Sequence, residues 1–174
     1  MQRNGNYSDM KSSAAVNRRL SGFTLVEIMI VLVIISILAL AAIPTGRGRV
    51  NKAYIGESLQ LIKPFEQRIS DYYTVHGLFP EDNAAVGLPE PSLITGNYLA
   101  SVEVVNGTLQ LTLGQKIGND LQGKVLSVRP VYVPDYPAIP ISWICGYDEV
   151  PENMATPEEN HTDIPRSDLP LTCL

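Results

Sequence analysis

The chain has 174 residues, of which 45% are hydrophobic and 18% charged, so its length suits one domain and its composition excludes a disordered chain or a coiled coil. The net charge of −5 argues against a general nucleic-acid binder. Two cysteines exclude a four-cysteine zinc site and a disulfide-rich scaffold, but they permit one bridge.

One long apolar stretch runs from Phe23 to Ile43, with Glu27 as its only charged residue. As a helix, a stretch of this length would extend about 31 Å, close to the roughly 30 Å hydrocarbon core of a bilayer. We therefore expect residues 23–43 to form a membrane-spanning helix. Residues 1–22 carry four basic side chains and one acidic one, which would hold them in the cytoplasm and send the remainder of the chain outward. An ordinary cleaved secretory signal is the alternative, but its apolar core would be shorter.

The junction between the polar and apolar segments reads R-R-L-S-G and then F-T-L-V-E. Gly22 directly precedes Phe23, Glu27 lies five residues after Gly22, and Pro44 follows the apolar stretch. This pattern resembles the class III signal of type IV prepilins. The resemblance implies that residues 1–22 are a leader peptide, and that a prepilin peptidase cuts between Gly22 and Phe23 and methylates the new amino terminus. A single-pass membrane protein that merely carries a buried glutamate is the alternative.

Glu27 also calls for a partner on physical grounds, because a carboxylate within lipid is costly and such residues are usually functional. No cation lies within the apolar stretch, but cleavage would create one, the α-amino group of Phe23. The resemblance assigns this pair to neighbouring subunits: the incoming amine meets the Glu27 of a subunit already in the filament, which favours assembly. A glutamate that extends to the membrane interface is the alternative interpretation.

Residues 50–76 carry apolar side chains at intervals of three and four, which predicts an amphipathic helix. The stripe consists of Tyr54, Leu61, Ile62, Phe65, Ile69, Tyr72 and Tyr73. Pro64 should kink this helix, and Gly77 followed by Pro80 should end it. Joined to the apolar stretch, it would make one long helix that is half membrane anchor and half spine of a globular domain over residues 44–174.

A β-sheet is expected after this helix. Asn106-Gly107 separates two alternating segments, a strong hairpin signal, so we expect strands over residues 97–105 and 108–113. Residues 124–133 and 139–145 would extend the hairpin to an antiparallel sheet of about four strands, whose apolar face packs on the helix. The predicted fold class is α+β, which is also the pilin fold that the resemblance implies.

The C-terminal region holds both cysteines. The resemblance implies a bridge from Cys145, in the last strand, to Cys173, near the end, formed in the oxidising space outside the membrane. Two free thiols are the alternative. Residues 131–174 contain eight acidic side chains and one basic side chain, Arg166, so we expect no direct binding of nucleic acid. Calcium is the one metal that such ligands would suit, but no regular ligand spacing exists, and we expect neither metal nor cofactor.

No motif in the sequence predicts an enzyme, because a glycine-rich phosphate loop and a nucleophile elbow are both absent and the only histidines are His76 and His161. The resemblance implies a structural subunit of a type IV pilus. Such a subunit starts in the inner membrane and is assembled by the pilus machinery into a homo-oligomeric surface filament used for adhesion, twitching motility or DNA uptake. A minor pilin or a type II secretion pseudopilin is the alternative within the family. A membrane-anchored periplasmic binding domain is the alternative from another class.

Overall fold

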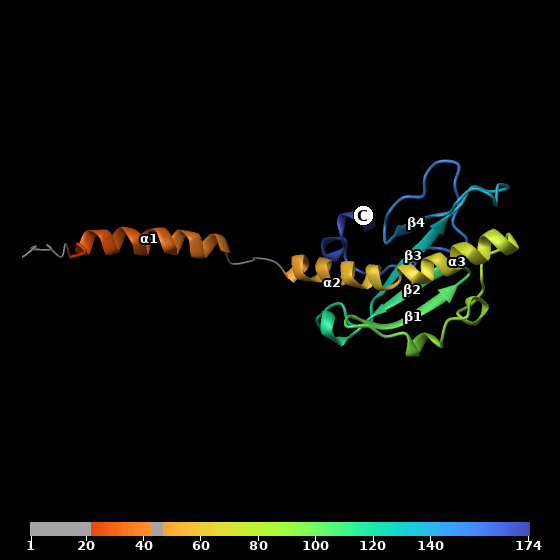
Figure 1. Cartoon of the computed structure of the whole chain (residues 1–174), viewed down its shortest axis with the longest axis horizontal. Coiled ribbons are helices and arrows are strands. Elements are labelled where there is room, and N and C mark those ends of the chain that lie inside the picture. Colours follow the sequence, from red (N-terminus) through yellow and green to blue (C-terminus); the bar gives the residue numbers. More distant parts are fainter. Residues whose placement is uncertain (1–21, 43–46) are drawn as a thin grey trace, which may run out of the picture. The chain divides into compact units, whose positions relative to one another are not determined.

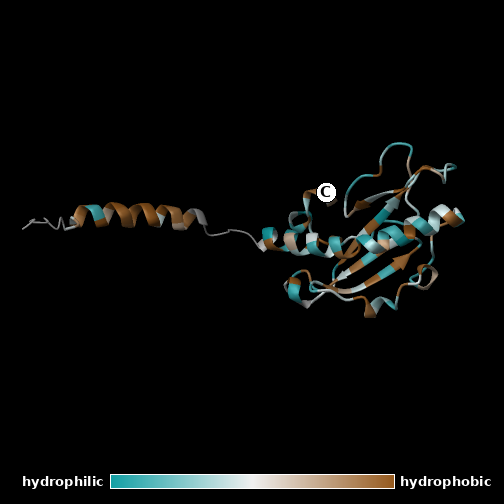
Figure 2. Ribbon diagram, in the orientation of Figure 1, coloured by the Kyte–Doolittle hydropathy of each residue, from teal (hydrophilic) through white to brown (hydrophobic). Residues whose placement is uncertain are grey.

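The computed structural model describes residues 22–42 and 47–174 and divides the chain into two units, residues 1–45 and 46–174 (Figure 1). In the first unit, helix α1 (Leu25–Ala42) is apolar on every side apart from Glu27 and Ser36 (Figure 2). The helix begins two residues later than predicted because Thr24 caps it: the Glu27 N–H donates to the Thr24 Oγ1 at 3.2 Å.

The sequence predicted a leader, a membrane-spanning helix and an unbroken long helix for this part of the chain. Among these residues, the structure contains no helix with both the length and the hydropathy needed to cross a membrane. The predicted leader, apart from Gly22, and the predicted continuity of one long helix through residues 43–46 both lie outside the described residues.

The second unit begins with helices α2 (Arg47–Leu61) and α3 (Lys63–His76), which are separated by a single residue, Ile62. Pro64 explains this interruption, since it has no N–H to donate to the carbonyl four residues earlier. Helix α3 ends where predicted, with the Gly77 N–H donating to the Tyr73 carbonyl at 2.8 Å.

The predicted four-stranded antiparallel sheet is confirmed, with strand order β1-β2-β3-β4. The strands are β1 (Leu99–Val105), β2 (Thr108–Leu113), β3 (Val125–Val131) and β4 (Ser142–Cys145). Short 3-10 helices complete the unit: η1 (Ala84–Val86), η2 (Pro91–Leu93), η3 (Gln115–Ile117), η4 (Arg166–Asp168) and η5 (Leu171–Cys173). Strand β4 starts three residues later than predicted because the Ile139 N–H closes a turn onto the Tyr136 carbonyl, and Pro140 has no N–H for a sheet.

The core lies between the α2–α3 helices and one face of the sheet. Ile55, Ile62 and Ile69 recur every seven residues and are fully buried, and Leu109 and Leu111 of β2 meet them in the same cluster. The predicted helix stripe is therefore partly wrong. Ile55 takes the buried position that had been given to Tyr54, which is only half-buried, and Leu61 remains exposed. The line of contact follows the isoleucines because a seven-residue step keeps to one side of an α-helix.

The outer edge of β1 is closed by one side chain, Asn83. Its Oδ1 accepts from the Val104 N–H at 2.6 Å, and its Nδ2 donates to the Val102 carbonyl at 3.1 Å and to the Pro89 carbonyl at 2.8 Å. The buried side-chain amide of Asn83 thus bonds to a backbone N–H and a backbone carbonyl of β1, the groups that a neighbouring strand would otherwise pair with. This arrangement protects an edge that could otherwise pair with another chain.

We predict that Asn83→Ala lowers the free energy of unfolding of the full chain by about 2–3 kcal/mol, because a backbone donor and an acceptor in buried surroundings lose their partner. Denaturant unfolding measures this loss. The matched control is Asn97→Ala, which removes a solvent-exposed bond to Glu57 and should change stability by no more than about 0.5 kcal/mol. Equal effects of the two substitutions would contradict the role given to Asn83.

Candidate functional site

The predicted cleavage site lies immediately before α1. Gly22 and Phe23 are both exposed and not helical, and Phe23 is 76% exposed. Among the described residues, no atom other than those of its chain neighbours approaches within 4 Å of the position that a Cβ on Gly22 would occupy. The described part of the chain therefore leaves the Gly22–Phe23 bond unobstructed, as cleavage there would require.

Glu27 lies in the first turn of α1, one helical turn from Phe23. Within residues 22–42 and 47–174, its carboxylate has neither a hydrogen-bond nor an ion-pair partner, although the helix N-terminus is a favourable place for a negative charge. The cap on this turn was missed in the sequence. Its signal is the spacing Thr24-x-x-Glu27, which matches a capping box.

The large apolar side chains of α1 are 46–76% exposed, and they occupy all sides of the helix. A helix that is apolar all round is normally buried in lipid or protein. The described part of the first unit thus combines an exposed Gly22–Phe23 bond, a carboxylate without a partner among these residues, and an apolar surface that needs covering.

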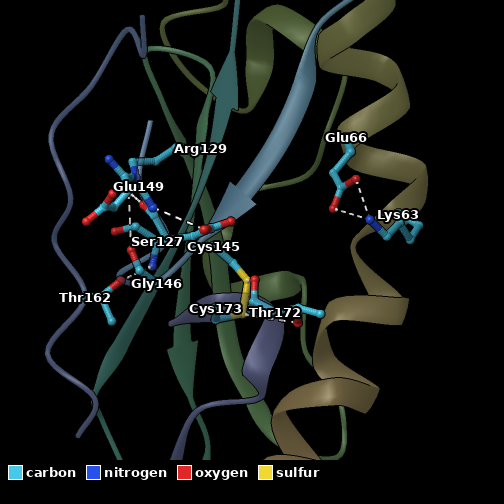
Figure 3. The surroundings of a disulfide bond; sticks show 11 residues. Lys63, Glu66, Ser127, Arg129, Cys145, Gly146, Glu149, Thr162, Thr172 and Cys173 are labelled. Atoms are coloured by element: carbon cyan, nitrogen blue, oxygen red, sulfur yellow. Dashed lines mark hydrogen bonds and ion pairs between the residues drawn. A yellow bond between two sulfur atoms is a disulfide. The ribbon is translucent and has the colours of Figure 1, made fainter. Parts of the chain in front are cut away.

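In the second unit, Cys145 and Cys173 form a disulfide, which confirms the pairing that the resemblance implied (Figure 3). It joins the end of β4 to η5, and both residues are buried. Gly146 allows this close approach: its φ is +58°, and a Cβ there would lie 2.6 Å from the Cys173 carbonyl oxygen. A groove of about 240 Å³ beside the bridge is lined by Lys63, Glu66, Trp143 and Thr172, among others.

The segment enclosed by the bridge lies along the free part of β3. The Ser127 N–H donates to the Thr162 Oγ1 at 3.1 Å, and the Ser127 Oγ accepts from the His161 N–H at 2.9 Å. The Val125 N–H donates to an Asp163 carboxylate oxygen at 2.7 Å. Residues 161–163 therefore continue along the part of β3 that β4 does not pair with. The C-terminal segment thus satisfies β3 backbone groups that β4 leaves without a partner strand.

A polar layer lies beneath this segment, and Arg129 is its charged member. The guanidinium donates to the carbonyls of Gly146 and Asp148 at 3.3 and 3.1 Å. Burial lowers the pKa of Arg129, while the Asp148 carboxylate acts in the opposite direction. Arg129 thus fixes the start of the enclosed segment, a role that its place in a strand did not reveal.

The acidic side chains of the C-terminal segment form no metal site in the part of the chain that the structure describes, where no group of three or more His, Cys, Asp or Glu residues is placed to hold an ion. Glu158 instead accepts a hydrogen bond from Asn106 at 2.7 Å, which contributes most to lowering its pKa. His161 lies 3.6 Å from Glu158, and His76 contacts the Tyr72 carbonyl at 2.9 Å.

Two family models match the chain: the prokaryotic N-terminal methylation motif over residues 17–43, and pilin (bacterial filament) over residues 51–173. The "Type IV major pilin protein PilE" of Neisseria gonorrhoeae is 30% identical over 91% of this chain and 96% of its own length. The "Type IV major pilin protein PilE1" of Neisseria gonorrhoeae is 32% identical with the same coverage. The "Prepilin peptidase-dependent protein D" of Escherichia coli K12 is 35% identical over 58% of this chain and 67% of its own length.

We predict that Cys145→Ser combined with Cys173→Ser lowers the free energy of unfolding by about 3–4 kcal/mol, since the bridge closes the loop of residues 145–173. Thermal unfolding with and without a reductant measures the effect. Reduced wild-type protein serves as the matched control and should lose as much stability as the double variant. Unchanged unfolding temperatures in both would contradict the stabilising role of the bridge.

Proposed function

The chain belongs to the pilin family of bacterial filament subunits, and from this membership we propose how its N-terminal unit is processed and assembled. The chain is a structural subunit of a type IV pilus, as its major-pilin relatives are. The observation that carries this conclusion is the joint presence of the methylation motif and a pilin domain in one chain. Subunits of this kind are made as precursors for prepilin peptidase and become part of an extracellular filament.

The proposed processing reaction is cleavage between Gly22 and Phe23, followed by methylation of the Phe23 amine. The exposed, non-helical backbone at this bond and the match of the methylation motif support it. The name of the Escherichia coli relative, a prepilin peptidase-dependent protein, points the same way.

The proposed assembly contact joins the Phe23 amine of one subunit to the Glu27 carboxylate of the next. Glu27 has no partner within the described residues. Cleavage would give every copy a positively charged Phe23 amine, one helical turn before its own Glu27. In apolar surroundings, two isolated charges would each be costly, and pairing them removes much of that cost. The contact would therefore select the register in which subunits add.

Before assembly, we place α1 in the inner membrane as a single-pass anchor with the second unit outside. The four basic residues that precede Gly22 support this orientation.

We further infer that the chain is the main filament subunit, as the names of its relatives state for them. The second unit, with 16 acidic and 9 basic residues, would repel nucleic acid, so a role of the filament in DNA uptake would depend on another subunit.

Replacing Gly22 tests the processing step. Gly22→Val should leave the leader attached and the chain in the membrane, because a branched side chain fills the open space at the bond. Mass spectrometry of the full chain and microscopy of sheared filaments measure both effects. Gly56→Val, the same change at an open position in α2, is the matched control and should be cleaved normally. Filament subunits that begin before Phe23 would contradict the proposed cleavage.

Replacing Glu27 separates assembly from anchoring. Glu27→Ala should enter the membrane and be cleaved at wild-type levels, since it removes a charge from an apolar helix. Filament yield should nevertheless fall about tenfold or more, because the incoming amine loses its partner. Ser36→Ala is the control in the same helix, as the Ser36 hydroxyl bonds only to the Leu32 carbonyl of its own turn. Wild-type yields from Glu27→Ala would show that the pairing is not needed.

A further inference from the structure

A pocket of about 400 Å³ opens between the C-terminus of α3 and the segment that follows β3. Its walls include Tyr73, Leu78, Phe79, Tyr132, Pro134 and Asp135. It lies at the end of the second unit opposite Arg47, where α2 begins (Figure 1). Tyr73 and Gly77, which end helix α3, also line this pocket.

Three aromatic rings form a corner within the pocket wall. Tyr73 and Phe79 stack with their ring centres 4.4 Å apart and their planes 20° apart. Tyr132 stands across them, 5.2 Å from Phe79 at an angle of 64°. Phe79 is held in place by Gly107, where a Cβ would come within 2.5 Å of the ring. The pocket wall therefore contains one packed group of rings, in which Tyr73 and Phe79 each cover one face of the other and Tyr132 stands at a steep angle to Phe79.

The polar groups of the pocket favour a cation. The hydroxyls of Tyr73 and Tyr132 and the carboxylate of Asp135 have no hydrogen-bond or ion-pair partner among the described residues. The lining contains no Lys, Arg or His, so Asp135 carries the only full charge. Aromatic faces are negative at their centres, so the rings and the carboxylate attract the same sign of charge.

We propose that this pocket binds a small quaternary ammonium cation, of which choline is the simplest biological example. Aromatic walls with a nearby carboxylate are the arrangement that recognises such groups. A primary ammonium group differs in that each of its three N–H donors needs an acceptor. A quaternary group needs no such acceptors.

Binding is measured on sheared, intact filaments of the full chain by equilibrium dialysis against choline. The neutral isostere 3,3-dimethylbutan-1-ol has the same shape without the charge, and it should bind about tenfold or more weakly. Phosphocholine is tested in parallel. Binding of either compound supports the proposal. Tighter binding of choline indicates a free metabolite as the source of the ligand, and tighter binding of phosphocholine indicates a lipid or surface headgroup. Equal binding of choline and the isostere would reduce the site to an apolar pocket and overturn the proposal.

Four variants assign the binding to the pocket. Tyr132→Leu removes a ring and should weaken choline binding about tenfold, whereas Tyr132→Phe keeps the ring face and should stay within about threefold. Asp135→Asn should weaken binding about threefold or more and leaves the fold intact, because asparagine tolerates the positive φ of this position. Tyr72→Leu is the matched control, since Tyr72 stacks on His76 outside this pocket, and it should bind choline normally.

Two results would contradict the inference directly. The first is binding of an uncharged methyl glucoside that is lost in Tyr132→Phe, which would identify a sugar site that depends on the phenol hydroxyl. The second is the absence of choline and phosphocholine binding to wild-type filaments. Filament formation is verified for each variant by microscopy, so a failure of assembly is distinguished from a failure of binding. Asp135→Asn still gives an answer if Tyr132→Leu does not assemble.

Discussion

The apolar surface of α1 is the constraint on which the account of this protein depends. The helix is apolar on every side, and none of the described residues buries it. Such a surface must be covered by lipid or by other protein, because leaving it in water is costly. A subunit that passes from membrane to filament exchanges one covering for the other. The single carboxylate of this helix, Glu27, is costly in both settings unless a cation reaches it, and the proposed cleavage before Phe23 would supply that cation.

In the second unit, the side chains that form the core differ from those that make the surface acidic. One face of the sheet packs on the α2–α3 isoleucines, and the segment that the Cys145–Cys173 bridge encloses lies along the free part of β3. That segment bonds to β3 mainly through backbone groups and small polar side chains, Ser127 and Thr162 among them. Its outward acidic side chains therefore contribute little to the core. This arrangement allows the exposed surface to be acidic without weakening the fold.

Local signals in the sequence predicted much of this structure. The Asn106-Gly107 turn located the hairpin within two residues at each strand end, and Pro64 located the break between α2 and α3. The features that were missed depend on contacts between distant residues. Asn83 closes an edge by bonding to Val104, 21 residues away, and nothing near Asn83 indicates this. The choice of Ile55 over Tyr54 likewise depends on where the sheet meets the helix. In the candidate site, the sequence showed Glu27 as the only charge of the apolar stretch, whereas only the structure showed that its side chain is exposed and has no partner among the described residues.

The central claim is that Glu27 pairs with the Phe23 amine of a neighbouring subunit. Cryo-electron microscopy of purified filaments at a resolution that shows side chains tests it most directly. We expect a Glu27 carboxylate oxygen to lie within about 4 Å of the Phe23 amine nitrogen of another copy, in every subunit of the filament interior. A Glu27 carboxylate that faces solvent, or that bonds only within its own subunit, would contradict it.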